Sequence, residues 1–160
     1  MTRARWLVLL TMLWAVAAAA DTYTARVVAV TDGDTIKVLD SQTQQHKIRL
    51  AGIDAPEKSQ PFGHRSKQHL SDLVFGKQVT LDCNKIDRYR REICVVLVDG
   101  KDANLGQVAA GLAWWYRKYA KEQSAQQRVD YEAAEDSARS GRLGLWIEPD
   151  PMPPWEWRHR

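Results

Sequence analysis

The chain has 160 residues, and its 23 Lys and Arg residues nearly balance its 20 Asp and Glu residues. That length is enough for one domain with its own core. Because the formal net charge is only +3, bulk charge is a weak argument for a nucleic-acid partner, and such an argument must rest on particular arginines.

The first 20 residues have the pattern of an export signal. Two arginines give a positive start, residues 6–16 are apolar, and Ala18 and Ala20 fit an A-x-A cleavage site. A membrane anchor is the alternative, but the apolar run is shorter than the ~20 residues that a spanning helix needs. We therefore expect a signal peptide over residues 1–20. Losing its two arginines leaves 21 basic against 20 acidic residues, a net charge of +1.

The mature chain is predicted to open with three strands. Asp32-Gly33 between two apolar runs is a strong signal for a tight hairpin. Apolar periodicity then predicts helices and two strands that flank a charged turn at 87–91. The expected strands cover 23–30, 36–39, 46–53, 79–83 and 93–98, and the expected helices cover 63–75, 103–110 and 122–139.

Three strands, a helix and two more strands are the order of an OB-type barrel, which often binds nucleic acids. We therefore predict an α+β fold, a five-stranded OB-type β-barrel with three packed α-helices, over residues 21–148. Residues 149–160 form a Pro/Trp-rich tail that is expected to be irregular, and most tryptophans are interpreted as packing residues.

Four charged residues near the first hairpin are candidates for a site. Asp34 opens a strand, where a carboxylate is disfavoured, whereas Asp54 and Glu57 alone fit an ordinary turn and a helix start. Carboxylates can hold a hard cation such as Ca²⁺ or activate water, and a guanidinium can grip two phosphate oxygens. Arg49 and Asp54 share a site only if the chain bends at Gly52, because strict alternation puts them on opposite faces.

The turn Asp87-Arg88-Tyr89-Arg90-Arg91 is the second charged group. Alone, it fits a solvated hairpin tip. Three arginines interleaved with a tyrosine also suit phosphate gripping and base stacking. Tyr116 and Tyr119 are further candidates for stacking a base, with core or rim packing as the alternative.

Cys83 and Cys94 are spaced too widely for a CxxC redox or zinc motif. The centre of the turn lies midway between them, so a symmetric hairpin places them directly opposite, with Cβ atoms ~4.5–5.5 Å apart. In an oxidising space such a pair is expected to form a disulfide. Two buried free thiols are the alternative.

Together these pieces resemble the micrococcal (staphylococcal) nuclease family, also called thermonucleases. The resemblance covers most of the mature chain, and its ordered set of motifs is highly specific. The motifs lie at 30–38, 48–57, 87–91, 111–114 and 143–146.

The resemblance implies an OB-type barrel with three helices and a Ca²⁺-dependent phosphodiesterase site. The roles it implies fall on Asp34, Asp54 and the Ala55 carbonyl for calcium, on Arg49 and Arg91 for phosphate, and on Glu57 for the attacking water. Substrate binding is expected at Arg88, Tyr89, Tyr116 and Tyr119.

The chain departs from the family pattern at two site positions. The family usually has threonine where Ala55 stands, so a hydroxyl is lost but the carbonyl survives. It often has glycine where Arg90 stands, and arginine disfavours the left-handed backbone that glycine adopts freely.

We therefore predict a calcium-dependent, sugar-nonspecific nuclease that hydrolyses phosphodiester bonds of DNA and RNA and leaves 3′-phosphate ends. A non-catalytic OB-fold module that binds single strands is the first alternative, since the fold alone permits it. A structural envelope-associated domain is the second, but it leaves the charged constellation unexplained. We expect an exported monomer, periplasmic or secreted, with no membrane association after signal cleavage.

Overall fold

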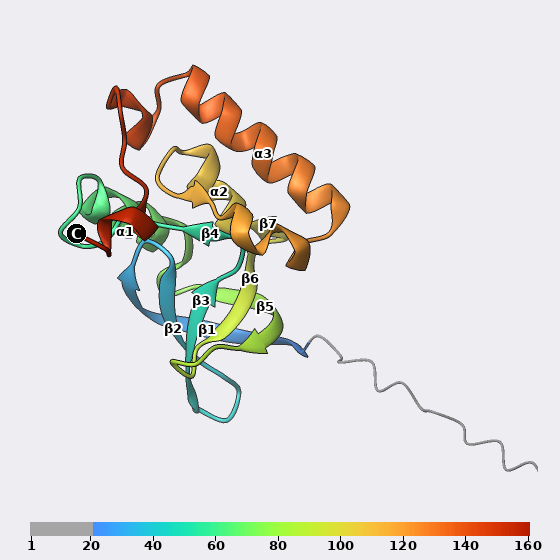
Figure 1. Cartoon of the computed structure of the whole chain (residues 1–160). Coiled ribbons are helices and arrows are strands. Elements are labelled where there is room, and N and C mark those ends of the chain that lie inside the picture. The colour runs from blue at the N-terminus through green and yellow to red at the C-terminus, as the bar shows by residue number, and fades with distance from the viewer. Residues whose placement is uncertain (1–20) are drawn as a thin grey trace, which may run out of the picture.

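The computed structural model describes residues 21–160 and shows a curled β-sheet with helices packed against it (Figure 1). The predicted signal peptide lies outside the described residues. The strands are β1 (Asp21–Asp32), β2 (Thr35–Leu39), β3 (Gln45–Leu50), β4 (Ile53–Asp54), β5 (Gln78–Ile86), β6 (Glu92–Val98), β7 (Lys101–Asp102) and β8 (Trp114–Trp115). The helices are α1 (Gly63–Val74), α2 (Ala103–Ala109), α3 (Ala125–Ser140) and α4 (Pro154–Trp157), with 3₁₀ turns η1 (Arg117–Glu122) and η2 (Gly144–Ile147).

Five of the strands close into a barrel. The sheet runs in the order β3-β2-β1-β5-β6-β7, and an additional pairing joins β3 to β6. That pairing is parallel and places Ile48 opposite Glu92 and Leu50 opposite Cys94, which completes the ring. A small closed barrel with helices outside it is the OB-type architecture. The predicted α+β fold is therefore confirmed.

Apolar side chains that alternate along the strands fill the barrel. Ile36 and Val38 in β2 and Ile48 and Leu50 in β3 are at most 1% exposed. The residues between them are more exposed, as the two-residue period of a strand requires. Since a shift of one residue would turn this set outward, the core fixes the register of the first hairpin and the position of its turn.

The first two helices agree with the prediction to within one residue, but the third begins later than predicted. Ser124 caps α3 in a capping box, in which its side chain accepts from the Gln127 backbone and the Gln127 side chain accepts from the Ser124 backbone. Residues 117–122 form η1 instead. No helix within residues 21–160 has the length and apolar character needed to cross a bilayer.

The predicted third strand is split in two. β3 ends at Leu50, Gly52 adopts a left-handed backbone with φ 72°, and β4 pairs with β8 in a separate two-stranded sheet. The split arises because the chain turns away from the barrel after β3. The turn carries Asp54 in β4, and Glu57 after it, out of the main sheet.

The C-terminal segment (residues 149–160) differs from the prediction of an irregular tail. It contains the short helix α4, which begins with Pro154, a residue suited to the first helical position because it lacks an N–H. Trp155 packs edge-on against Trp114, with ring centroids 5.6 Å apart, and Gln60 donates to the Met152 carbonyl at 2.6 Å. These contacts hold the C-terminal segment against the domain.

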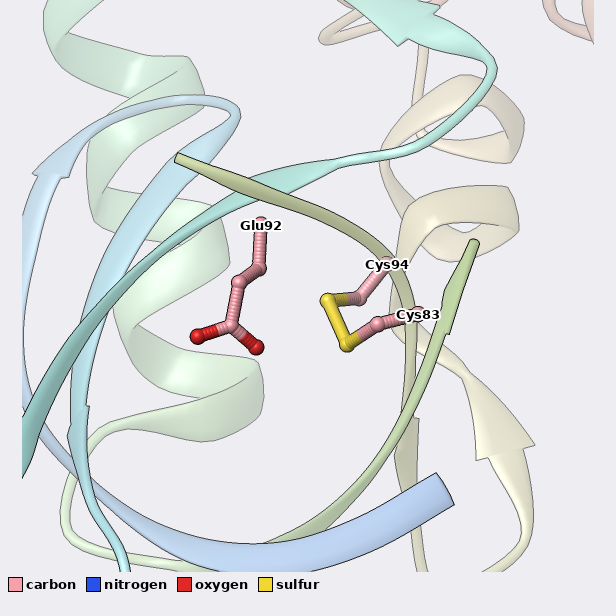
Figure 2. A group of neighbouring side chains, drawn as sticks. All are labelled: Cys83, Glu92 and Cys94. Carbon is pink, nitrogen blue, oxygen red and sulfur yellow. A yellow bond between two sulfur atoms is a disulfide. The ribbon is translucent and has the colours of Figure 1, made fainter. Parts of the chain in front are cut away.

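Cys83 of β5 and Cys94 of β6 form the predicted disulfide. They are directly opposed in the β5–β6 hairpin, with Cα atoms 4.0 Å apart. Figure 2 shows the Glu92 carboxylate near this bridge, where three potential metal-ligating side chains come together within residues 21–160. Because the sulfurs are bonded to each other, neither is a thiolate that can bind a metal. The disulfide therefore staples the hairpin that carries the 87–91 turn.

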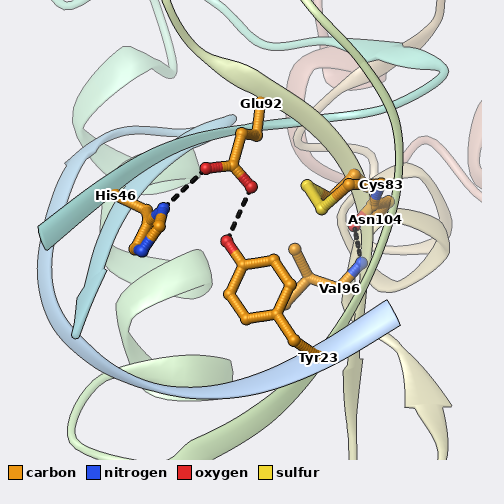
Figure 3. Close-up of a disulfide and its surroundings, with 7 residues drawn as sticks. Tyr23, His46, Cys83, Glu92, Val96 and Asn104 are labelled. Carbon is orange, nitrogen blue, oxygen red and sulfur yellow. Dashed lines mark hydrogen bonds and ion pairs between the residues drawn. A yellow bond between two sulfur atoms is a disulfide. The ribbon is translucent and has the colours of Figure 1, made fainter. Parts of the chain in front are cut away.

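A chain of polar side chains lies beside the disulfide (Figure 3). Glu92 accepts from the Tyr23 hydroxyl at 2.7 Å and lies 2.7 Å from His46 Nδ1, and His46 Nε2 lies 3.1 Å from Asp40. Burial acts to lower the pKa of His46, but the bonds to Glu92 and Asp40 outweigh it and raise that pKa. These hydrogen-bonded side chains link β1, β3 and β6 near the strand pairing that closes the barrel.

Candidate active site

A cleft of about 870 Å³ collects charged and aromatic side chains from distant parts of the chain. Its walls come from the β1–β2 turn, the β3–β4 bend, the segment after β4, the β5–β6 turn, η1 and the C-terminal segment. The cleft is lined by every residue for which the sequence predicts a metal, catalytic or substrate role. These are Asp34, Arg49, Asp54, Ala55, Glu57, Arg88, Tyr89, Arg91, Tyr116 and Tyr119.

Asp34 lies in the two-residue turn between β1 and β2, and its side chain is buried. Its Oδ2 accepts from the Ala55 backbone N–H at 3.0 Å, and its Oδ1 accepts from the Thr35 hydroxyl at 2.9 Å. These bonds tie the first hairpin to the segment after β4. They bring Asp34 to the side of the barrel where Asp54 lies.

The turn that carries Asp34 is held from behind by two helices. Gly33 packs so closely on α1 that a Cβ there would lie 1.9 Å from the Ser66 hydroxyl oxygen. The buried Gln107 of α2 donates to the Gly33 carbonyl at 2.7 Å and to the Ser66 carbonyl at 3.0 Å. Gln107 was not predicted from the sequence. The only sign of its role there is that a polar residue stands beside the apolar face of a short helix.

Arg49 lies between the two buried aspartates. Its guanidinium forms an ion pair with Asp34, and its Nη2 lies 2.9 Å from Asp54 Oδ1. The bend at Gly52 that this arrangement requires is present, with φ 72°. Asn104 supports the bend by donating to the backbone carbonyl that precedes Gly52 at 3.0 Å. Arg49 and Asp54 therefore lie side by side although they are five positions apart in the chain.

Glu57 is held by contacts at both its backbone and its carboxylate. Its N–H donates to the Gln60 side chain at 3.1 Å, and its Oε1 accepts from Arg158 Nη1 at 2.7 Å. Arg158 Nη2 lies 2.7 Å from Asp54 Oδ2, so one guanidinium contacts both carboxylates. The sequence analysis missed Arg158, which is 104 residues from Asp54 and belongs to no recognisable motif.

The pKa values of Asp34 and Asp54 are shifted in opposite directions. Burial acts to raise the pKa of both, but at Asp34 the Arg49 guanidinium outweighs burial and lowers the pKa. At Asp54, burial and the nearby Asp34 charge outweigh the bonds from Arg158 and Arg49, and the pKa is raised. Burial and Asp34 also raise the pKa of Asp32 to about 6. The cluster therefore favours a further positive charge.

The 87–91 turn is ordered by Asp87. Its Oδ2 accepts from Arg91 Nε at 2.8 Å, and its Oδ1 accepts from the backbone N–H groups of Tyr89 and Arg91. Arg90 has φ 62°, the left-handed conformation expected where glycine is common. Arg88 and Arg91 lie 5.1 and 5.4 Å from the Tyr89 ring centre. These three line the cleft, and Arg90 does not.

Aromatic rings from residues 116–119 and from the C-terminal segment also line the cleft. Tyr116 stacks on Trp155 with the ring planes 4° apart and the centroids 5.2 Å apart, and Tyr119 meets Tyr116 edge-on at 5.0 Å. Lys85 lies over the Tyr119 ring, with its ammonium nitrogen 4.8 Å from the ring centre. Trp155 is therefore part of the cleft as well as a packing residue.

The donor atoms fit a hard divalent cation. Asp34, Asp54 and Glu57 offer carboxylate oxygens, the ligands of Ca²⁺ and Mg²⁺. Both aspartates already converge on one positive group, the Arg49 guanidinium. Within residues 21–160 the site carboxylates do not form a set of three whose ligand atoms all lie within 4.8 Å. A cation there would therefore need backbone, water or substrate oxygens besides the two aspartates.

A small OB-type barrel with paired carboxylates, arginines and aromatic rings in one cleft has the groups that a nuclease, a hydrolase of phosphodiester bonds, requires. A family model described as Staphylococcal nuclease homologue matches residues 47–148. An "Uncharacterized endonuclease" from Haemophilus influenzae is 42% identical over 137 residues, 86% of this chain and 74% of that protein. A "Micrococcal nuclease" from Shigella flexneri is 41% identical over 145 residues, 85% of this chain and 80% of that protein. The chain belongs to the staphylococcal nuclease family.

Proposed function

We propose that this nuclease uses Ca²⁺ to hydrolyse both DNA and RNA and leaves 3′-phosphate ends. The observation that carries the proposal is the convergence of buried Asp34 and Asp54 on Arg49, in a cleft that also holds Glu57 and Arg91. Each residue type has a distinct use in cleaving a phosphodiester. The resemblance to micrococcal nuclease supplies the bond that is cut, P–O5′.

Asp34, Asp54 and the Ala55 carbonyl would hold the Ca²⁺, which when bound supplies charge neutralisation at a phosphate oxygen. Glu57 would take a proton from the water whose oxygen bonds to phosphorus. The P–O5′ bond would break with its electron pair on the 5′-oxygen, which would take a proton from solvent water, and the phosphate would stay on the 3′-oxygen. Arg49 and Arg91 would stabilise the charge that builds on the phosphoryl oxygens, a role that guanidinium geometry suits.

The same cleft supports a nuclease that accepts both sugars. Arg88, Tyr89, Tyr116 and Tyr119 offer cations for phosphates and rings for bases. These contacts recognise groups that DNA and RNA share. Discrimination would need a group that reads the 2′-hydroxyl.

A binding module without catalysis explains this cleft less well. A protein that only grips phosphate gains nothing from two buried aspartates and a third carboxylate beside them, because like charges repel the ligand. Chelation separates the two functions, since binding by arginines and rings can survive EDTA and metal-assisted cleavage cannot.

The proposal includes export to the periplasm or the medium and action as a monomer. The Cys83–Cys94 disulfide supports export, because such bridges persist in oxidising compartments.

The test is digestion of supercoiled plasmid and of a single-stranded RNA by residues 21–160, with Ca²⁺, Mg²⁺ or EDTA. We expect cleavage of both substrates with Ca²⁺ and none with EDTA, with products whose 3′ ends require phosphatase before polymerase extension. Cleavage that is unaffected by EDTA, or retained binding without cleavage in Ca²⁺, would contradict the proposal.

A further inference from the structure

Arg158 forms ion pairs with two carboxylates in the cleft, those of Asp54 and Glu57. Its Nη1 lies 2.7 Å from Glu57 Oε1 and 3.3 Å from Asp54 Oδ1, and its Nη2 lies 2.7 Å from Asp54 Oδ2. The guanidinium therefore bridges the carboxylates that the proposed function uses for metal binding and for water activation. A planar fork of donors suits this two-sided contact, and a point charge does not.

The C-terminal segment is anchored at two points that precede Arg158 in the chain. Gln60 donates to the Met152 carbonyl at 2.6 Å, and Gln60 also accepts from the Glu57 backbone, so one amide touches both the segment and the loop that it covers. Two residues after Pro153, Trp155 stacks flat on Tyr116. These anchors hold the backbone of the segment beside the loop that carries Glu57.

The Glu57 carboxylate depends on Arg158 for its position. Within residues 21–160, Arg158 is the side chain that pairs with the Glu57 carboxylate, and the Glu57 side chain is 39% exposed. Asp54 is almost fully buried beside it. Without a cation between them, repulsion between two carboxylates and the freedom of a long side chain would turn Glu57 toward solvent.

We propose that Arg158 is a positioning residue that holds the Glu57 carboxylate beside Asp54 in the geometry needed to activate water. This role rests on the proposed function. The Arg158–Glu57 pair is exposed, so it adds little to stability. Asp54 is buried, but it keeps its second ion pair, to Arg49, when Arg158 is lost. Displacement of a catalytic group by ~1 Å can reduce turnover ~10²-fold. Loss of Arg158 should therefore affect turnover far more than folding.

The test is a double-mutant cycle with Arg158→Ala and Glu57→Gln, measured on a short oligonucleotide with saturating Ca²⁺. We expect Arg158→Ala to lower kcat by ~10–100-fold while KM changes by less than ~3-fold. In the Glu57→Gln background, the same substitution should lower kcat no further, because a positioning residue acts through the group it positions. Arg158→Lys should recover part of the loss.

Arg160→Ala is the matched control, because Arg160 lies over the Trp157 ring in the same segment and does not line the cleft. It should leave kcat and KM unchanged. Calorimetry should give Ca²⁺ affinities within ~3-fold for wild type and Arg158→Ala. Thermal unfolding of Arg158→Ala and Arg158→Lys shows whether either variant loses its fold, and Arg158→Lys carries the test if Arg158→Ala does.

Three results would overturn the role. Full multiplication of the two effects in the double variant, or a raised KM with normal kcat, would make Arg158 a phosphate contact. Faster turnover together with tighter Ca²⁺ binding in Arg158→Ala would make it a competitor of the metal. An inactive wild-type enzyme would refute the proposed function itself, a result that the digestion experiment identifies before any variant is made.

Discussion

Arg49 Nη2 lies 2.9 Å from Asp54 Oδ1, although the two residues are five positions apart in a segment that begins as a strand. Strict alternation would put their side chains on opposite faces. The contact exists because the chain reverses its local direction at Gly52, whose φ of 72° is costly for residues with a Cβ. One glycine therefore decides whether the site assembles.

Gly52→Ala should lower the free energy of unfolding by more than Gly100→Ala does. Both glycines have left-handed backbones, φ 72° and 75°, so each substitution carries a strain of ~1–2 kcal/mol. A Cβ at Gly52 also lies 2.5 Å from Gln123 Nε2, whereas nothing lies within 4 Å of one at Gly100. Moving Gln123 would disturb its bond from buried Trp115 Nε1. Urea unfolding measures both losses, and equal losses would show that the Gln123 contact relaxes freely.

Glu57→Gln should retain the fold and Ca²⁺ binding but lower kcat by ~10²–10⁴-fold, because an amide cannot accept a proton from water. Glu132→Gln, an exposed change on α3, is the control and should behave as wild type. Single-turnover rates on an oligonucleotide are the measurement. If Glu57→Gln turns over at the wild-type rate, another group is the base.

Asp34→Asn and Asp54→Asn should each weaken Ca²⁺ binding by at least ~10-fold, since each removes a negative charge from a site of hard oxygen ligands. Asparagine keeps the shape of the buried side chain and reduces the damage around Arg49. Asp130→Asn, on the exposed face of α3, is the control. Isothermal titration with Ca²⁺ gives the affinities, and unchanged values in both site variants would remove the metal assignment.

Arg91→Lys should lower kcat ~10²-fold, because lysine keeps the charge but loses the fork that Asp87 now orients. Arg88→Ala should mainly raise KM and flatten the salt dependence of binding. Arg90→Ala should stay near wild type, since Arg90 does not line the cleft. Kinetics on a short dinucleotide substrate distinguish these effects. Near-normal kcat in Arg91→Lys with a collapse in Arg90→Ala would exchange the two assignments.

The wild-type protein should be stabilised relative to His46→Gln at pH 6, and the difference should shrink as pH rises to 9. Glu92 and Asp40 raise the folded-state pKa of His46 above its unfolded value. The contribution is therefore fully present below ~6.5 and is lost as pH rises through the folded-state pKa. Urea unfolding across this range is the measurement, with exposed His64→Gln as control. A constant difference would place the effect in packing.

The barrel and most of the site were predictable because their signals are local. The Asp32-Gly33 turn and the alternating strands each fix a short-range geometry. Cys83 lies six residues before Tyr89 and Cys94 five after it, and a register shift between Cys83 and Lys85 brings the two cysteines opposite each other. The bend at Gly52 was predictable because Arg49 and Asp54 cannot share a site in a regular strand. Local reasoning therefore reached the residues that come from neighbouring strands and turns.

Contacts across long sequence separations were out of reach. Arg158 meets Asp54 from 104 positions away, and Gln107 reaches the Gly33 carbonyl from 74 positions away. In the sequence, Arg158 cannot be distinguished from an ordinary surface arginine, nor Gln107 from an ordinary helix glutamine. The start of α3 differs from the prediction for another reason. Apolar periodicity alone extends the helix back to Glu122, but the capping box at Ser124 makes the helix begin at Ala125.

The residues that line the cleft are synthesised in a fixed order, from the N-terminus to the C-terminus. Its carboxylates come from residues 32–57, its arginine turn from residues 87–91, and its last wall from Trp155, Arg158 and His159. The strand pairing that closes the barrel also waits until residues 92–94 have been made. A nascent chain therefore displays the acidic residues long before it has the complete surface for gripping a polynucleotide. The finished cleft therefore belongs only to a chain that has been synthesised through residue 159.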